Sequence, residues 1–247
     1  MTLFLTSKTG PSYFNGERWT VAPFYVENGF RAAVQARWPE EARVLLIASD
    51  PDGTEINDEM LASTVQAMED SGLPVAEAAM LDRRNQDEAA AFIRESGVIQ
   101  LCGGHVPTQN EFFREIGLAD LLRDFDGIVI GISAGSMNSG KLVYAQPEEE
   151  GEALDPDYPR YMEGLGLADI TLLPHFQELP GTVLDGLDVI TEISLPDSFL
   201  HPFFAIPDGS YFLVEDGRAM LFGEGYWLEN GEIERICEDG EMLDLNE

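Results

Sequence analysis

Short apolar runs alternate with helical segments through the first half of the chain, and this alternation constrains the fold more than any other feature. The apolar runs that predict strands are Arg43–Ser49, Pro74–Leu81, Val98–Cys102 and Gly127–Ile132. Helical spacing and stop signals predict helices over Asn57–Ser71, Gln86–Ser96 and Thr108–Phe125, the last with a break near Gly117. Because continuous apolar strands linked by helices form parallel sheets covered on both faces, we predict an α/β three-layer sandwich with a mostly parallel central sheet.

The C-terminal part has a different pattern, in which short strands follow one another through turn sequences. The predicted strands are Phe203–Ile206, Ser210–Val214, Arg218–Phe222 and Gly225–Leu228, with PDG, EDG and GEG at the turns between them. Such turns are typical of antiparallel hairpins. We expect these hairpins to extend the same sheet, so that residues 1–247 form a single domain, which is an ordinary size for one core.

Composition excludes several classes of partner. With 46 acidic and 14 basic residues, the chain carries a formal net charge of −32, which repels the phosphates of nucleic acids. No apolar run is long enough to span a membrane, and the first residues lack the features of a secretory signal. The two cysteines, Cys102 and Cys237, form neither a disulfide framework nor a metal-binding spacing. We therefore expect a cytoplasmic protein that needs no metal or cofactor.

A candidate nucleophile follows the last predicted parallel strand. The sequence Gly131-Ile132-Ser133-Ala134-Gly135 is a G-x-S-x-G pattern between a buried strand and an expected helix. Small residues on both sides allow a sharp turn that lifts the serine hydroxyl above the sheet, where the next amide, that of Ala134, can stabilise an oxyanion. The pattern alone also fits a tight turn with a capping serine. A second turn, Gly103-Gly104, follows another buried strand and can supply a second amide near Gly104.

A serine nucleophile needs a base, and the chain has three histidines. His175 ends the apolar run ITLLPHF and is expected at a sheet edge, whereas His105 lies in the Gly-Gly loop and His201 before a later strand. The base also needs a carboxylate that orients it. The acids between Ser133 and His175 include Glu148, Glu149, Glu150, Glu152, Asp155 and Asp157, and spacing alone does not choose among them.

These residues occur in the order found in a known family. The turn Cys102–His105, the elbow Gly131–Gly135, the segment Leu173–Phe176 and the segment Ala205–Gly209 resemble peptidase E and the cyanophycinases, serine peptidases with a class I glutamine amidotransferase-like fold. The resemblance implies that Ser133 is the nucleophile and His175 the base of a peptidase that hydrolyses short peptides as a monomer or homodimer. It places the third triad member at Glu148, with Glu152 as the alternative, and the oxyanion donors at the amides of Gly104 and Ala134.

Two other functions stay open at this point. Peptidase E uses basic groups to hold an N-terminal aspartate, and no arginine or lysine lies between His175 and Arg218. A non-catalytic module that binds a small molecule on the same scaffold is therefore an alternative. A cyanophycinase-like hydrolase that cuts an Asp–Arg polymer is another, because an acidic pocket would attract arginine side chains.

The acidic residues are spread along the whole chain, which favours a solvated shell suited to high salt over a local site for cations. Salt ions screen the repulsion among these charges, so we predict that the thermal unfolding midpoint rises steeply as KCl is added. Thermal denaturation followed by circular dichroism between low and molar KCl measures this effect. An unfolding midpoint that does not respond to KCl would exclude the interpretation.

Overall fold

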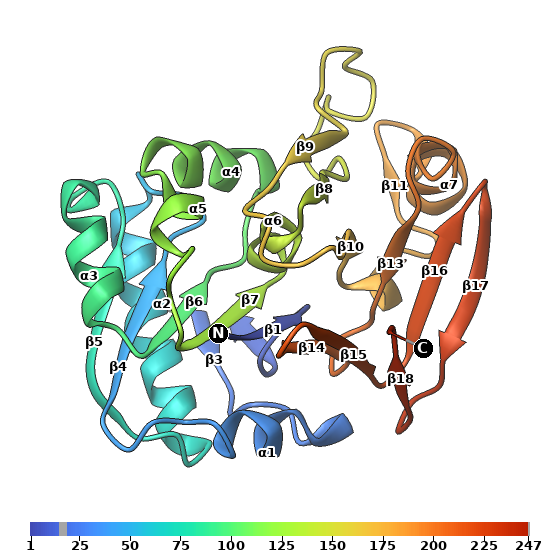
Figure 1. Ribbon diagram of the computed structural model, residues 1–247. Coiled ribbons are helices and arrows are strands. Elements are labelled where there is room, and N and C mark those ends of the chain that lie inside the picture. Colours follow the sequence, from blue (N-terminus) through green and yellow to red (C-terminus); the bar gives the residue numbers. More distant parts are fainter. Residues whose placement is uncertain (15–18, 247) are drawn as a thin grey trace.

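A computed structural model describes residues 1–14 and 19–246 (Figure 1). Its largest sheet has the strand order β18-β15-β14-β1-β7-β6-β4-β5. The strands of this sheet are β1 (Thr2–Thr6), β4 (Ala42–Ile47), β5 (Val75–Leu81), β6 (Val98–Leu101), β7 (Ile128–Ile132), β14 (Tyr211–Glu215), β15 (Arg218–Phe222) and β18 (Met242–Asp244). The strands from β1 to β5 in this order pair in parallel, and β14, β15 and β18 pair antiparallel. The alternation and the turns predict this arrangement for all of them except β1 and β18.

Helices cover both faces of this sheet and bury one core on each. One face packs against α3 (Ala89–Glu95), α4 (Val106–Glu115) and α5 (Leu118–Leu121). The other packs against α1 (Phe30–Gln35) and α2 (Thr54–Asp70). The three-layer α/β class is therefore confirmed. The strand β1 was not predicted, although it lies between β7 and β14 in the middle of the sheet.

The C-terminal strands divide between two sheets, which corrects the prediction that all of them extend the central one. A second sheet has the order β10-β13-β16-β17, and its members are β10 (Leu172–Leu173), β13 (Phe203–Ala205), β16 (Gly225–Glu229) and β17 (Glu232–Cys237). The chain passes from this second sheet to the central one between β13 and β14. The strand β13 pairs with β10 in the second sheet, whereas β14 pairs with β1 in the central sheet. Aromatic side chains pack the two sheets together, because Phe204 of β13 contacts both Phe212 of β14 and Trp227 of β16.

Smaller elements complete the fold. The two-stranded sheets are β2 (Ser12–Phe14) with β3 (Trp19–Val21), β8 (Leu142–Tyr144) with β9 (Tyr161–Glu163), and β11 (Val183–Leu184) with β12 (Leu187–Asp188). The short helices are α6 (Ala134–Ser139), α7 (Leu195–Asp197), three 3₁₀ helices at Glu27–Gly29, Gln86–Glu88 and Phe176–Glu178, and a π-helix at Val189–Ser194. Within residues 1–14 and 19–246, no helix is both long and apolar enough to cross a membrane.

The register of the parallel strands places several loops at one edge of the sheet. Thr6 pairs with Ile132, and Leu101 pairs with Gly131, so β1, β6 and β7 end side by side. In parallel α/β sheets the carboxyl ends of the strands form the usual position for a site. We therefore expect the active site in the loops that follow these three strands.

Candidate active site

Ser133 lies at the junction of β7 and α6 in a backbone conformation that side chains rarely adopt. Its φ and ψ angles are 49° and −115°, and a non-glycine residue in such a region stores strain that the surrounding structure must hold. The Ser133 N–H donates to the carbonyl of Thr6 at 2.9 Å, and the Ser136 hydroxyl donates to the same carbonyl at 2.8 Å. The sharp strand-to-helix turn predicted from the sequence is thus fixed to the end of β1.

Glycines are required around this turn because other segments approach it closely. A Cβ atom at Gly131 would lie 2.8 Å from the Ser136 Cα, and one at Gly135 would lie 2.2 Å from the Leu101 carbonyl oxygen. Both distances are shorter than real Cβ contacts, so any larger residue would displace backbone. The elbow is consequently packed directly against the end of β6.

The Gly103-Gly104 turn also lies against the serine. A Cβ at Gly103 would be 3.1 Å from the Cβ of Ser133, and one at Gly104 would be 2.3 Å from the Ser49 hydroxyl oxygen. Ala134 is the first residue of α6, so its N–H is one of the helix amides that have no acceptor within the helix. The amides at Gly104 and Ala134 therefore come from two turns that flank Ser133.

His175 is positioned by β1 and by the loop after β13. It has a left-handed conformation, with a φ of 56°, and its N–H donates to the Ser7 hydroxyl at 3.0 Å. The Nδ1 of its ring lies 2.8 Å from the Oδ1 of Asp208. The backbone carbonyl of His175 also accepts from the N–H of Glu178 at 2.8 Å, and none of the described hydrogen bonds of His175 goes to Ser133. Because a carboxylate only accepts, Nδ1 carries the proton and Nε2 is the basic nitrogen.

Asp208 is held in its charged form by a lysine and by the ring N–H of His175. Its Oδ2 lies 3.0 Å from the Lys8 Nζ, which also binds Glu178 at 3.1 Å. Burial acts to raise the pKa of Asp208, but its hydrogen bonds to His175 and Lys8 and their charges hold that pKa below its usual value. Asp208 is therefore a carboxylate at neutral pH and can stabilise a protonated His175.

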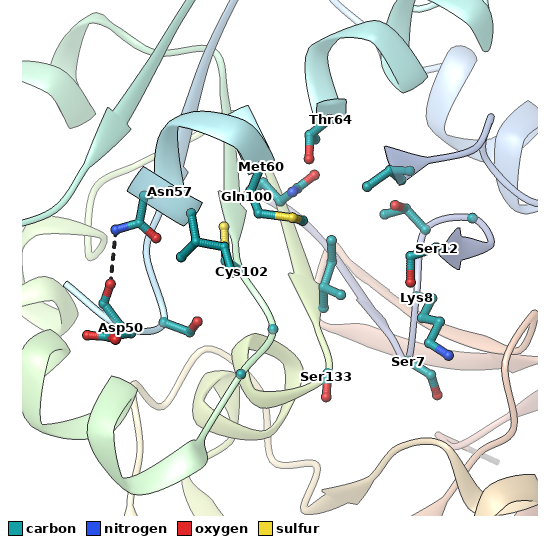
Figure 2. A pocket seen from close by; sticks show the side chains of 18 of the residues that line it. Ser7, Lys8, Ser12, Asp50, Asn57, Met60, Thr64, Gln100, Cys102 and Ser133 are labelled. Carbon is teal, nitrogen blue, oxygen red and sulfur yellow. Dashed lines mark hydrogen bonds between the residues drawn. The ribbon is translucent and has the colours of Figure 1, made fainter. Parts of the chain in front are cut away.

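Two cavities meet at Ser133 and His175, which line both of them. The first has a volume of about 500 Å³ and lies between α2 and the ends of β1, β6 and β7. The second has a volume of about 410 Å³ and is bounded by Glu148, Leu173 and residues near β11. In Figure 2 the Ser133 side chain stands at the border of the first cavity, on the side of Ser7 and Lys8. A bond attacked by Ser133 can therefore have one substituent in each cavity.

The predicted third member of the triad differs from the one that the geometry brings to His175. The sequence placed Glu148 there, with Glu152 as the alternative. Glu152 instead lies 2.8 Å from the Nε2 of His105, and it accepts the backbone N–H of Glu148 at 2.8 Å. Glu152 is thus the partner of a second histidine, and Asp208 occupies the position beside His175.

Glu148 lies at the rim of the second cavity and has an unusual protonation equilibrium. The Glu148 side chain is exposed overall, but protein atoms around its carboxyl group partly remove it from water, and this desolvation raises the pKa of Glu148 to about 7; the charge of Glu152 adds to the rise, while His105 and His175 oppose it. Glu148 therefore lies within the range of electrostatic interaction with both histidines. It can exchange a proton, or pair with a cation, near neutral pH.

The remaining candidates have other roles. His201 is exposed and packs edge-on against the Tyr161 ring, at a centroid distance of 4.8 Å. Burial raises the pKa of the Cys102 thiol to about 12, so this cysteine is no nucleophile at neutral pH. The ligand atoms of His175, Glu178 and Asp208 lie within 4.8 Å of one another, as in a metal site. Lys8 already bridges the two carboxylates there, so a cation is part of the cluster.

Sequence reasoning missed Asp208 and Lys8. Asp208 lies in Ala205–Gly209, a segment assigned only to a hairpin, although an acid directly after a buried strand can be placed at a sheet edge. Lys8 directly follows β1, which was not predicted. Recognition of a strand in TLFLT would have placed Lys8 beside the elbow.

Comparisons with known proteins bear on the family and the fold of this chain. The family model for peptidase family S51 matches residues 31–222. A solved structure described as a putative peptidase E protein from Listeria monocytogenes EGD-e has the same fold, with a TM-score of 0.58 and 16% sequence identity, over 96% of this chain and 98% of that one. No curated protein matches the chain. Since the family model covers well over half of the sequence, the chain belongs to peptidase family S51.

Proposed function

We propose that this peptidase is a serine peptidase of short peptides, with Ser133 as nucleophile, His175 as base and Asp208 as the acid that orients the base. The observation that carries the proposal is the strained Ser133 backbone at the border of two cavities that His175 also lines, with Asp208 2.8 Å from the Nδ1 of the imidazole. This combination matches the geometric logic of nucleophile, base and orienting carboxylate.

The reaction is an acyl transfer in two halves. The Nε2 of His175 accepts the proton of the Ser133 hydroxyl while the oxygen attacks the peptide carbonyl. The imidazolium that forms is stabilised by Asp208 and then protonates the leaving amine, so that an ester remains on Ser133. Water, deprotonated by His175, cleaves the ester and restores the hydroxyl. A movement of the Ser133 or His175 side chain must bring the two into hydrogen-bond contact, as is common when substrate binds.

The negative charge of the tetrahedral intermediate needs donors that are already in place. The amides of Gly104 and Ala134 belong to the two turns that flank Ser133, and they are the proposed donors. One such donor typically lowers the barrier by about 3 kcal/mol.

The substrate has a free amino terminus in this proposal. Glu148 and His175 both line the second cavity, and none of the ion pairs in the described part of the chain involves Glu148. A peptide ammonium group would supply a cationic partner for it. Lys8, the lysine at the site, is already bound by two carboxylates, so the site offers no free cation for an aspartyl side chain among the described residues. We therefore propose small dipeptide-like substrates without a requirement for aspartate.

Substitutions in the triad test the assignment. We expect Ser133→Ala to abolish peptide hydrolysis and Asp208→Asn to lower kcat by about 10³- to 10⁴-fold, because the asparagine amide no longer selects the correct tautomer of His175. Glu178→Gln is the matched control, since Glu178 binds the same lysine, whereas the described hydrogen bond to the His175 ring comes from Asp208. It should lower kcat by less than about tenfold. Hydrolysis of a dipeptide library in high KCl gives these rates.

A fluorophosphonate probe separates the enzyme from the alternative, a non-catalytic binding module. The probe should label the wild-type protein at Ser133 and leave Ser133→Ala unlabelled, as mass spectrometry of the peptides would show. Absence of labelling in a folded protein would favour the binding module, and near-wild-type turnover by Asp208→Asn would remove Asp208 from the triad.

The raised pKa of Glu148 gives the substrate affinity a pH dependence with a defined sign. Below about pH 7 the carboxyl is neutral, and above it the carboxylate can pair with an ammonium group. For a dipeptide with a free amine, we expect KM to fall as the pH rises through 7 and then to level off. Glu148→Gln should raise KM at pH 8 and remove this dependence. The N-acetylated dipeptide is the control substrate, and an equal pH dependence of its KM would contradict the role of Glu148.

A further inference from the structure

Gln100 is a polar residue on an apolar face of the central sheet. It lies in β6 and is only 2% exposed, while its partners in register, Leu46 in β4 and Ile130 in β7, are fully buried. Packing alone favours another aliphatic side chain at this position. A residue that departs from the pattern of its neighbours next to a site is a candidate for function.

The amide of Gln100 also lacks part of its hydrogen bonding. In the part of the chain that the structure describes, its Oε1 is one of two buried side-chain polar atoms without a partner, and the other is the Ser194 hydroxyl. The carbonyl oxygen is therefore the open group of this amide. A buried acceptor without a donor destabilises the fold, so its retention calls for a partner that arrives from outside.

The open oxygen belongs to the wall of the 500 Å³ cavity. Gln100 lines this cavity, and Figure 2 shows it with Met60 and Thr64 of α2, away from Ser133 across the pocket. The walls between them are largely apolar, with Ile132 and Met80 among the lining residues. A group that enters from Ser133 therefore crosses an apolar space before it reaches the amide.

Resting on the proposed peptidase function, we propose that this cavity is a specificity pocket and that Gln100 selects an uncharged substrate side chain with an N–H or O–H donor at its tip. The chemical class is a long or aromatic side chain, such as a phenol, whose body fills the apolar walls and whose donor bonds to Oε1. The apolar walls around Gln100 disfavour an ionised tip there. Sites that bond a substrate hydroxyl discriminate strongly against analogues that lack it.

Three side chains of one shape test this recognition. Tyrosine carries a donor at the ring tip, phenylalanine carries none, and 4-pyridylalanine carries only an acceptor. Dissociation constants of dipeptides with each residue at either position are measured by calorimetry on Ser133→Ala, which binds without turnover. We expect the tyrosine peptide to bind about tenfold more tightly than the phenylalanine peptide, and the pyridyl peptide to bind most weakly. In Ser133→Ala/Gln100→Leu the preference for tyrosine should disappear.

The control variant removes the other buried side-chain atom that has no partner, the Ser194 hydroxyl. Ser194 is fully buried and lines neither cavity at Ser133, so Ser133→Ala/Ser194→Ala should keep the tyrosine preference. Gln100→Leu should also raise the melting temperature, because it replaces the unpaired amide with a side chain like its neighbours. A loss of selectivity together with a gain in stability cannot come from unfolding.

The outcomes separate this proposal from the proposed function. Equal binding of the three peptides, a preference for the pyridyl peptide, or a tyrosine preference that survives Gln100→Leu would overturn the role of Gln100. None of these results alters the rate at which wild-type protein hydrolyses peptides, which is measured in parallel. If the wild-type protein hydrolyses no peptide but the tyrosine preference depends on Gln100, the pocket assignment stands and the peptidase mechanism fails.

Discussion

The parallel pairing of β1 with β7 holds Ser133 in its strained conformation, and the rest of the site depends on it. The N–H of Ser133 and the hydroxyl of Ser136 both bond to the Thr6 carbonyl, so the end of β1 acts as the anchor of the elbow. A strained backbone persists only where its surroundings over-determine it. Here a fully buried strand in the middle of the sheet supplies that constraint, and the serine hydroxyl is directed to the strand ends where two cavities meet.

The same strand end organises the base. Ser7 accepts the His175 N–H, and Lys8 binds the carboxylate that contacts the imidazole. A chain with a net charge of −32 places one of its few cations where it keeps Asp208 ionised. A protonated His175 would be stabilised by Asp208, while Lys8 prevents an excess of negative charge around it. The nucleophile and its base are thus positioned by consecutive residues of one short segment, Thr6–Lys8.

Local patterns predicted the parts of the fold that depend on local sequence. The strand at 127–132 and the elbow after it follow from apolar runs and glycines, and the close contacts at Gly131 and Gly135 give the reason. The sequence did not reveal the partner of His175, because Asp208 reaches it through the parallel pairing of β10 with β13, a long-range contact that no spacing rule contains. The same applies to Gln100, whose apolar neighbours are set by the order of β4, β6 and β7. Glu148 and Glu152 were chosen because they follow the nucleophile in the chain, as the resemblance implies, but the described hydrogen bond to the imidazole comes from Asp208.

A crystal structure of the protein labelled by a fluorophosphonate tests the central claim most directly. The account predicts phosphorus bonded to the Ser133 Oγ, with the phosphoryl oxygen about 2.7–3.1 Å from the amide nitrogens of Gly104 and Ala134, and with His175 still bound to Asp208. An adduct whose oxygen points into solvent, or a His175 ring that has left Asp208 for Glu148, would contradict it.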